Sequence, residues 1–388
     1  MELEYCLDLC VNKVRKNIHR MTWGLREYPS TPSGYYFDVP KEKTINFFHI
    51  MNWTASFYTG MALLALERTE RREFLVWLYE QSPLYYSKVF DHPEETMHDL
   101  GFLYGLYSLP LFRLTGDPIQ RNISLKAADE LAKRYILNGN YIKAWGRMDG
   151  KISPKADKSE ALQPFFTESI GLAIIDCMMN LPLLFWASQE TGNDFYQSIA
   201  MAHADTTLKH FIRNDGSVYH AYRFHPETGH PIGGCNYCGY SDESYWARGT
   251  AWAIYGFALA YGYTKKTEYI QTSLRLAHCF IGNLKENGIP VWDFKLPDHE
   301  PKGEDSSAAA IAACGIMEIL KYRKDEPLLQ RTVDRILSTL TTEEYTNFDD
   351  ECPGVLKHQN GNDTYTIFGD YFYMEALAKK NGKALLFW

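Results

Sequence analysis

An isolated carboxylate in an apolar segment is the strongest chemical signal in this sequence. Asp176 is the single charged residue between Gly171 and Ser188, in the run GLAIIDCMMNLPLLFWAS. A carboxylate in such surroundings must be paired, protonated or turned toward a cavity, and partial burial raises its pKa toward the range that acid catalysis uses. We therefore expect Asp176 to take part in general acid–base chemistry.

Two further charges accompany apolar segments. Asp99 follows His98 at the start of one, where an acidic residue could serve catalysis or only stabilise the helix N-terminus by about 0.3–1 kcal/mol. Arg248 is the single charge between Glu243 and Lys265. It could pair with Glu243, or it could bind a substrate carboxylate through two parallel hydrogen bonds.

Tryptophan and histidine side chains occur close to these charges in the sequence. A tryptophan can stack on a sugar ring, although core packing is the commoner role for any one of them. Combined with the carboxylates and the arginine, they favour an enzyme acting on a polar, anionic, ring-shaped substrate. The candidate site residues are Asp99, Asp176, Trp53, His98, His220, Trp246, Arg248 and Trp252.

The cysteines give no metal signal. Cys235 and Cys238 form a lone CxxC in a glycine-rich stretch, with His220, His225 and His230 upstream. Because there is no second CxxC and the histidine spacing fits no zinc pattern, we expect neither a metal nor a cofactor. The eight cysteines are expected to be free thiols.

Helical segments of two kinds alternate along the chain and must position these residues. One kind is apolar nearly all round, which predicts burial on several sides; these segments are 54–67, 97–113, 168–190, 244–263, 306–322 and 369–378. The other kind is more polar and has one apolar stripe; its members are 5–20, 72–86, 119–137, 194–212, 267–284 and 328–340.

This alternation predicts an all-α fold, a closed (α/α)6 barrel of six inner and six outer helices, as one domain over residues 1–388. Asp176 is then expected in the middle of an inner helix. An open superhelical array of helical hairpins competes, but it predicts polar terminal caps, whereas both ends of this chain are apolar helices or lead into one. The long connections 21–53, 138–167, 213–243 and 286–305 should gather at one mouth and form the active-site pocket.

The composition narrows the choice of partners. The chain has 388 residues, 45% of them hydrophobic and 15% aromatic, and a net charge of −8 without a basic block, which argues against nucleic acid. No stretch reaches the roughly 18 uninterrupted apolar residues that span a bilayer, and MELEYCLDLCVNKVRK does not read as a secretory signal. We therefore expect a cytoplasmic protein with no membrane partner.

Over nearly its whole length the chain resembles the unsaturated glucuronyl hydrolases of glycoside hydrolase family 88. The matching segments are NWTASFYTG around Trp53, HDLGF at Asp99, IIDCMMNLPLLFWA at Asp176, SVYHAYRFHPETG at His220, GYSDESYWARGTAWAIYG through Arg248, and FGDYFYMEAL near the end of the chain. The fold of that family is an (α/α)6 barrel, which agrees with the alternation of helical segments.

The resemblance implies a role for each candidate. Asp176 would be the catalytic general acid and base, and Asp99 its assisting carboxylate. The residues implied around the substrate are Trp53, His98, His220, Cys238, Trp246, Arg248 and Trp252. Cys238 departs from the family pattern, which usually has Gln there, and a thiol cannot supply the paired donor and acceptor of an amide.

The resemblance also implies an unusual reaction. The substrate would be an oligosaccharide, such as a glycosaminoglycan fragment, whose terminal uronic acid carries the C4=C5 double bond left by a polysaccharide lyase. Hydration of this enol ether would release the sugar without a metal or organic cofactor. Two alternatives stay open: an unsaturated rhamnogalacturonyl hydrolase acting on pectin fragments, and a non-catalytic carbohydrate-binding protein built from α-hairpins.

Overall fold

The computed structural model describes residues 2–20, 53–151, 169–362, 364–382 and 387–388. The predicted connection 21–53 therefore lies outside the described residues except for Trp53, and so do residues 152–167 of the predicted connection 138–167. Within the described ranges no helix is long and apolar enough to cross a bilayer.

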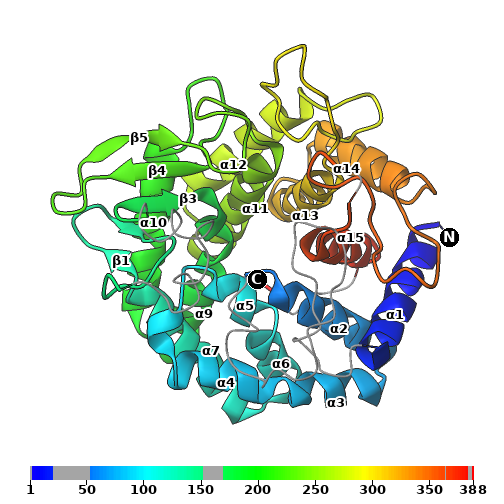
Figure 1. Cartoon of the computed structure of the whole chain (residues 1–388), viewed down its shortest axis with the longest axis horizontal. Coiled ribbons are helices and arrows are strands. Elements are labelled where there is room, and N and C mark those ends of the chain that lie inside the picture. The colour runs from blue at the N-terminus through cyan, green and yellow to red at the C-terminus, as the bar shows by residue number, and fades with distance from the viewer. Residues whose placement is uncertain (1, 21–52, 152–168, 363, 383–386) are drawn as a thin grey trace.

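Two concentric rings of helices form the molecule (Figure 1). Each inner helix contacts the next, and the last contacts the first, so the ring closes. The inner ring consists of α2 (Ala55–Thr69), α5 (Leu100–Gly105), α9 (Leu181–Thr191), α11 (Ala247–Thr264), α13 (Ser306–Tyr322) and α15 (Ile367–Lys380). The closed (α/α)6 barrel predicted from the sequence is confirmed, and the open array is wrong.

Most of the outer helices contact two neighbouring inner helices. For example, α1 contacts both α2 and α15, and α12 contacts both α11 and α13. The outer ring consists of α1 (Glu2–Arg20), α3 (Arg72–Glu80), α4 (Ser82–Phe90), α7 (Pro118–Ala132), α10 (Asp194–His210), α12 (Thr267–Ile281) and α14 (Pro327–Leu340). The remaining described helix, α6 (Ser108–Thr115), follows α5 and packs on α7.

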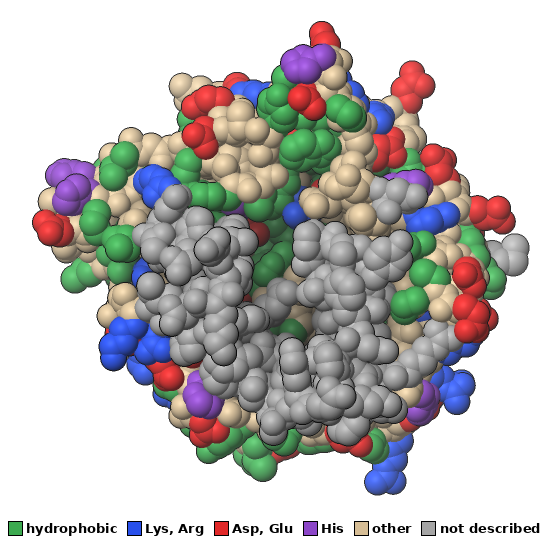
Figure 2. Space-filling view, in the orientation of Figure 1, with side chains coloured by type: hydrophobic (Ala, Val, Ile, Leu, Met, Phe, Trp, Pro, Cys, Tyr) green, Lys and Arg blue, Asp and Glu red, His purple; other side chains and the backbone are tan. Residues whose placement is uncertain are grey.

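Inner helices are buried all round because small residues let them approach closely. In α11 every residue from Ala247 to Ala260 is buried. A Cβ atom on Gly315 would lie 2.9 Å from the Cα atom of Tyr255, so α13 and α11 could not pack this closely with a larger residue there. Figure 2 shows the face seen in Figure 1: apolar side chains and a few charged ones are visible in the central hollow, and most charged side chains lie toward the periphery.

The predicted inner helix 168–190 is wrong in its first half. Leu172–Ile174 forms strand β3, Ile175–Met179 forms a 3-10 turn, and α9 begins only at Leu181. The β-branched pair Ile174–Ile175 favours the extended start, and Pro182 in the first turn of α9 favours a helix beginning there. Asp176 therefore lies in the turn between strand and helix, and not in the middle of a helix.

The predicted segment 97–113 is also interrupted. Proline 110 has no N–H to donate to the carbonyl of Leu106, so a continuous helix is disfavoured. That carbonyl accepts a hydrogen bond from Thr59 Oγ1 instead, at 3.0 Å. Helix α5 consequently ends at Gly105, and α6 begins at Ser108.

Short antiparallel strands flank the barrel. Strand β3 pairs with β4 (Ala221–Phe224), which pairs with β5 (Pro231–Cys235), and β1 (Tyr135–Ile136) pairs with β2 (Tyr141–Ile142). The register places Ile174 opposite Ala221. This pairing puts Asp176, two residues after β3 ends, beside His220, one residue before β4 begins.

Candidate active site

The candidate residues gather at the N-terminal ends of the inner helices. Asp99 immediately precedes α5, Asp176 lies in the turn before α9, and Arg248 is in the first turn of α11. Trp53 lies two residues before α2 begins. Residues from four inner helices are thereby brought to one end of the barrel.

Asp176 and Asp99 form an interacting pair of carboxyl groups. Burial raises the pKa of Asp176 to about 6, against the opposing positive charge of Arg248. Burial, and next the negative charge of Asp176, raise the pKa of Asp99 to about 7, against the opposing charges of Arg134 and Lys88. Because the two groups interact, they titrate as a pair, and near neutral pH the pair can hold one proton.

Asn180 holds the two carboxylate segments together. Its Oδ1 accepts a hydrogen bond from the main-chain N–H of Phe102 at 2.7 Å, and its Nδ2 donates to the carbonyl of Asp176 at 3.2 Å. A Cβ atom on Gly101 would lie 2.2 Å from the Cα atom of Asn180, so only glycine allows this approach. The start of α5 is in this way fixed against the turn that carries Asp176.

His220 is oriented so that it donates toward Asp176. Its Nδ1 accepts a hydrogen bond from the main-chain N–H of Tyr237 at 3.1 Å, so the ring proton must be on Nε2. Nε2 lies 3.6 Å from Oδ2 of Asp176. Burial, and next the charge of Arg248, lower the pKa of His220 to about 3, so the ring is neutral at physiological pH. Oδ2 of Asp176 thus faces the N–H of His220 just beyond hydrogen-bond distance, and it is buried without a hydrogen-bond partner among the described residues.

His98 is buried beside Asp99. Its Nε2 lies 3.2 Å from Oδ1 of Asp99, and its main-chain N–H donates to the carbonyl of Ala144 at 3.2 Å. Burial, and next the charge of Arg134, hold the pKa of His98 far below its usual value. His98 is therefore a neutral neighbour of Asp99 that contributes no positive charge.

Arg248 offers one edge of its guanidinium group. Nη1 is bound by Asn360 Oδ1 at 3.0 Å and lies 3.4 Å from Asp305 Oδ2. The guanidinium group lies over the rings of Trp246 and Phe368, at 4.7 Å from each centroid. Nε is buried and has no hydrogen-bond partner among the described residues. The edge that includes Nε can therefore bind a carboxylate.

The ion-pair partner of Arg248 differs from the one that sequence proximity suggested. Glu243 pairs with Arg213, at 3.1 Å, and Asp305 takes its place at Arg248. Asp305 also caps α13, because its Oδ1 accepts from the main-chain N–H of Ala308 at 3.1 Å. The site residue Arg248 is thus fixed to the start of the next inner helix.

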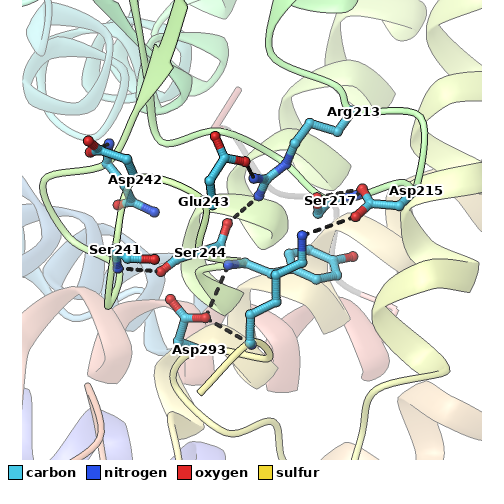
Figure 3. A network of polar contacts seen from close by, with 11 residues as sticks. Arg213, Asp215, Ser217, Ser241, Asp242, Glu243, Ser244 and Asp293 are labelled. Atoms are coloured by element: carbon cyan, nitrogen blue, oxygen red, sulfur yellow. Dashed lines mark hydrogen bonds and ion pairs between the residues drawn. The ribbon is translucent and has the colours of Figure 1, made fainter. Parts of the chain in front are cut away.

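A network of polar contacts holds the loop 236–245 that leads into α11 (Figure 3). Oδ1 of the fully buried Asp293 accepts from the main-chain N–H groups of Tyr245 and Lys295, each at 3.0 Å. Arg213 donates to the carbonyl of Ser244. The loop carries the main-chain N–H of Tyr237, so the network helps to fix the tautomer of His220.

The tryptophans differ in exposure. Trp246 and Trp252 are almost completely buried, and Trp53 is partly exposed. The ring of Trp246 packs edge-on against His220 at 5.0 Å, and Trp53 packs on Trp252 at 6.5 Å. Trp246 and Trp252 therefore support the site from behind, and Trp53 is the one with ring surface left for a sugar.

The cysteines are free thiols, as the sequence predicted. Cys238 lies on the loop 236–245, where desolvation, and next the charge of Asp176, raise the pKa of its thiol to about 12 against the opposing charge of Arg248. Its main-chain N–H donates to Asn236 Oδ1 at 3.1 Å. Across the described ranges, no group of three His, Cys, Asp or Glu side chains is arranged to hold a metal ion.

The sequence analysis missed several residues that contact the site. Asp305 could have been found, because it precedes the run SSAAA and is typical of a helix N-cap. Asn360, Phe368 and the main-chain N–H of Tyr237 are brought to the site only by tertiary packing. Arg134 could have been noticed as a charge at the end of α7, but nothing in its surroundings marks it as buried.

Comparison with known proteins gives consistent results. The model of Glycosyl Hydrolase Family 88 matches residues 35–375. An unsaturated chondroitin disaccharide hydrolase of Streptococcus pyogenes serotype M1 is 35% identical, over 97% of this chain and 91% of its own. An unsaturated glucuronyl hydrolase of Bacillus sp. (strain GL1) is 35% identical, over 87% of this chain and 88% of its own. The crystal structure of an unsaturated glucuronyl hydrolase from Streptococcus agalactiae matches with a TM-score of 0.86 at 31% identity, covering 100% of this chain and 94% of that one.

Proposed function

Because the chain belongs to glycoside hydrolase family 88, we propose that it hydrolyses lyase-generated oligosaccharides, glycosaminoglycan fragments above all, and releases their terminal unsaturated uronic acid. The observation that carries the proposal is the geometry around Asp176. A buried carboxyl group with a raised pKa has one oxygen turned to the Nε2 of His220, and its pKa responds to Arg248, whose free edge suits a carboxylate.

Substrate binding would use the charge of the unsaturated sugar. The uronate carboxylate would bind the free edge of Arg248, which Asp305 and Asn360 hold in place. Trp53 has the exposed ring surface on which the sugar could stack. The neighbouring Trp246 and Trp252 would keep that surface and the guanidinium group in position.

Protonated Asp176 would then deliver its proton to C4 of the sugar. The C4=C5 double bond supplies the electron pair, and positive charge develops at C5 and the ring oxygen. Water, deprotonated by the resulting Asp176 carboxylate, adds to C5 and gives a hemiketal. The hemiketal opens, and the remainder of the oligosaccharide leaves as an alcohol. One carboxyl group thus acts as acid and then as base, which a pKa near the working pH favours.

Asp99 would assist as a negative charge. In the substrate complex, where Arg248 is neutralised, an ionised Asp99 would repel the ionised form of Asp176 and so favour the protonated acid. It would also stabilise the positive charge that develops on the sugar ring. The neutral state of His98 and His220 leaves this charge uncompensated by an imidazolium.

The proposal predicts different pH limits for the free enzyme and the substrate complex. The proton on Asp176 is required, so activity is lost as the pH rises through its pKa. In the free enzyme the charge of Arg248 lowers that pKa. A bound uronate neutralises the charge, so the alkaline limb of kcat should lie above that of kcat/KM by about one pH unit.

The two limbs can be measured with an unsaturated disaccharide between pH 4.5 and 9, from the loss of ultraviolet absorbance. The control is thermal stability over the same range, which excludes unfolding as the cause of either limb. If the alkaline limb of kcat lay at the same pH as that of kcat/KM, or at a lower pH, binding of the substrate carboxylate at Arg248 would be contradicted.

The experiment that tests the proposed function is a turnover panel of unsaturated chondroitin, hyaluronan, heparin and pectin disaccharides. We expect turnover of at least one glycosaminoglycan disaccharide and little of the pectin-derived one. Exclusive turnover of the pectin disaccharide would instead make the chain a rhamnogalacturonyl hydrolase. Binding without depletion of any substrate would contradict the enzyme. A cytoplasmic location is part of the proposal, supported by the eight free thiols.

A further inference from the structure

Arg134 follows the end of α7 and is 1% exposed. All the hydrogen bonds that the described residues make with its guanidinium group are to main-chain carbonyl oxygens. Nε donates to Lys143 (2.9 Å), Nη1 to Thr96 (2.7 Å), and Nη2 to Ala144 (3.1 Å), Trp145 (3.2 Å) and Gly146 (2.9 Å). The donors are satisfied, but the charge is not paired with a bound carboxylate.

A buried charge of this kind is costly. Carbonyl dipoles satisfy the N–H groups, yet they replace the solvation of the whole charge only in part. The carboxyl group on which this charge acts is that of Asp99. Two contacts hold Arg134 close to Asp99. Arg134 donates to the carbonyl of Thr96, three residues before Asp99. The carbonyl of Ala144 accepts hydrogen bonds from both Arg134 and the main-chain N–H of His98.

The electrostatic surroundings of Asp99 come from several elements. Asp176 and the Cys177 thiol lie on the turn before α9, Lys88 lies on α4, and His98 is the preceding residue. Asp176 opposes ionisation of Asp99, whereas Arg134 and Lys88 favour it. Arg134 is the larger of the two favourable influences.

We propose that Arg134 is a positioning residue whose unpaired buried charge keeps Asp99 ionised, so that the one proton held by the carboxyl pair resides on Asp176 when substrate is bound. The inference rests on the proposed function. It assigns a role to a residue that is not expected to touch the substrate. Among the described residues, Arg134 makes no hydrogen bond to either carboxyl group of the pair.

The two buried arginines would then decide where the proton lies. Arg248 favours ionised Asp176, and Arg134 favours ionised Asp99. When the substrate carboxylate neutralises Arg248, the influence of Arg134 on Asp99, aided by that of Lys88, remains. The proton is therefore placed on Asp176 at the moment when it is needed, and Asp99 keeps the negative charge that opposes the developing cation.

Arg134 also has a mechanical role that the test must separate from its charge. The loop it binds carries Trp145, whose ring lies 6.3 Å from that of His220 and 5.4 Å from that of Tyr237. Any substitution loosens this loop. Arg134→Gln and Arg134→Lys both lose most of the carbonyl contacts, but only Arg134→Lys keeps a positive charge.

The pH profile of kcat/KM for an unsaturated disaccharide is the discriminating measurement. Without the charge, Asp99 stays protonated to a higher pH, so the acid limb of Arg134→Gln should move up by about one pH unit, with kcat reduced about tenfold. The acid limb of Arg134→Lys should stay at the wild-type position, whatever its rate. Arg147→Gln is the matched control, because its charge is paired with Glu95 and Asp149, and it should leave the limb unchanged.

An unshifted acid limb in a folded Arg134→Gln, or equal shifts in both variants, would overturn the inference. If Arg134→Gln does not fold, Arg134→Lys still tests the inference. Because this variant retains the positive charge, a shift of its acid limb would exclude an electrostatic role for Arg134. These outcomes are distinct from failure of the proposed function, which would appear as wild-type protein that turns over no unsaturated disaccharide.

Discussion

Replacing Asp176 by Asn is expected to abolish turnover while leaving the protein folded. Asn has nearly the same shape, but it cannot deliver a proton to C4 or accept one from water. Because one group would perform both transfers in the proposed mechanism, the loss should exceed the roughly 10²–10⁴-fold that is typical of a single acid–base group. Affinity should largely survive, because Arg248 and Trp53 are unchanged.

The stability of this variant gives an independent check. Burial raises the pKa of Asp176 from 3.8 to about 6, so the ionised carboxylate destabilises the folded state at neutral pH. A neutral Asn removes that destabilisation, so Asp176→Asn should unfold at a temperature no lower than wild type. Loss of activity with unchanged or higher stability is what a catalytic carboxylate predicts.

The measurement compares turnover, calorimetric binding of an unsaturated disaccharide and thermal unfolding. Asp334→Asn is the control, since Asp334 is an exposed carboxylate on α14 that pairs with Lys380. It should behave as wild type in all three assays. Turnover near the wild-type rate in Asp176→Asn would remove Asp176 from the mechanism.

The sequence predicted the architecture well because burial patterns are local. Alternation of all-round apolar segments with striped ones follows from the position of each helix in the rings, and every residue of α11 from Ala247 to Ala260 is buried as expected. The same reasoning misread the start of the segment 168–190. An apolar run does not distinguish a buried strand from a buried helix, and pairing of β3 with β4 decided between them.

The structure brings the candidate site residues to one end of the barrel, but the sequence did not predict the contacts that hold them there. Asp176 and Arg248 stand out because each is an isolated charge in an apolar segment. Their partners come from far along the chain: Asp305 and Asn360 at Arg248, and the main-chain N–H of Tyr237 behind His220. Such contacts depend on the closed barrel and on register, which no local pattern contains.

Saturated uronyl disaccharides are expected to bind but to remain uncleaved, at rates several orders of magnitude below those of the unsaturated compounds. Ordinary glycosidases place two carboxyl groups on either side of the anomeric carbon and therefore act on saturated sugars. In the proposed mechanism the first proton goes to C4, and a saturated ring has no double bond there to accept it. Because Arg248 would bind the carboxylate of both compounds, the saturated disaccharide should act as a weak competitive inhibitor.

The fate of the double bond and of the water oxygen tests the same step directly. Hydration removes the conjugated ene-carboxylate, so its ultraviolet absorbance should disappear at the rate at which the disaccharide is split. In heavy-oxygen water the label should enter at C5 and leave the anomeric carbon unlabelled, because the proposed mechanism has water attack C5. Asp176→Asn, which cannot start the reaction, is the control for uncatalysed exchange of label. Release of saturated glucuronic acid at a comparable rate, or label at the anomeric carbon, would contradict hydration and indicate ordinary glycoside hydrolysis. In that case Asp176 would not protonate C4.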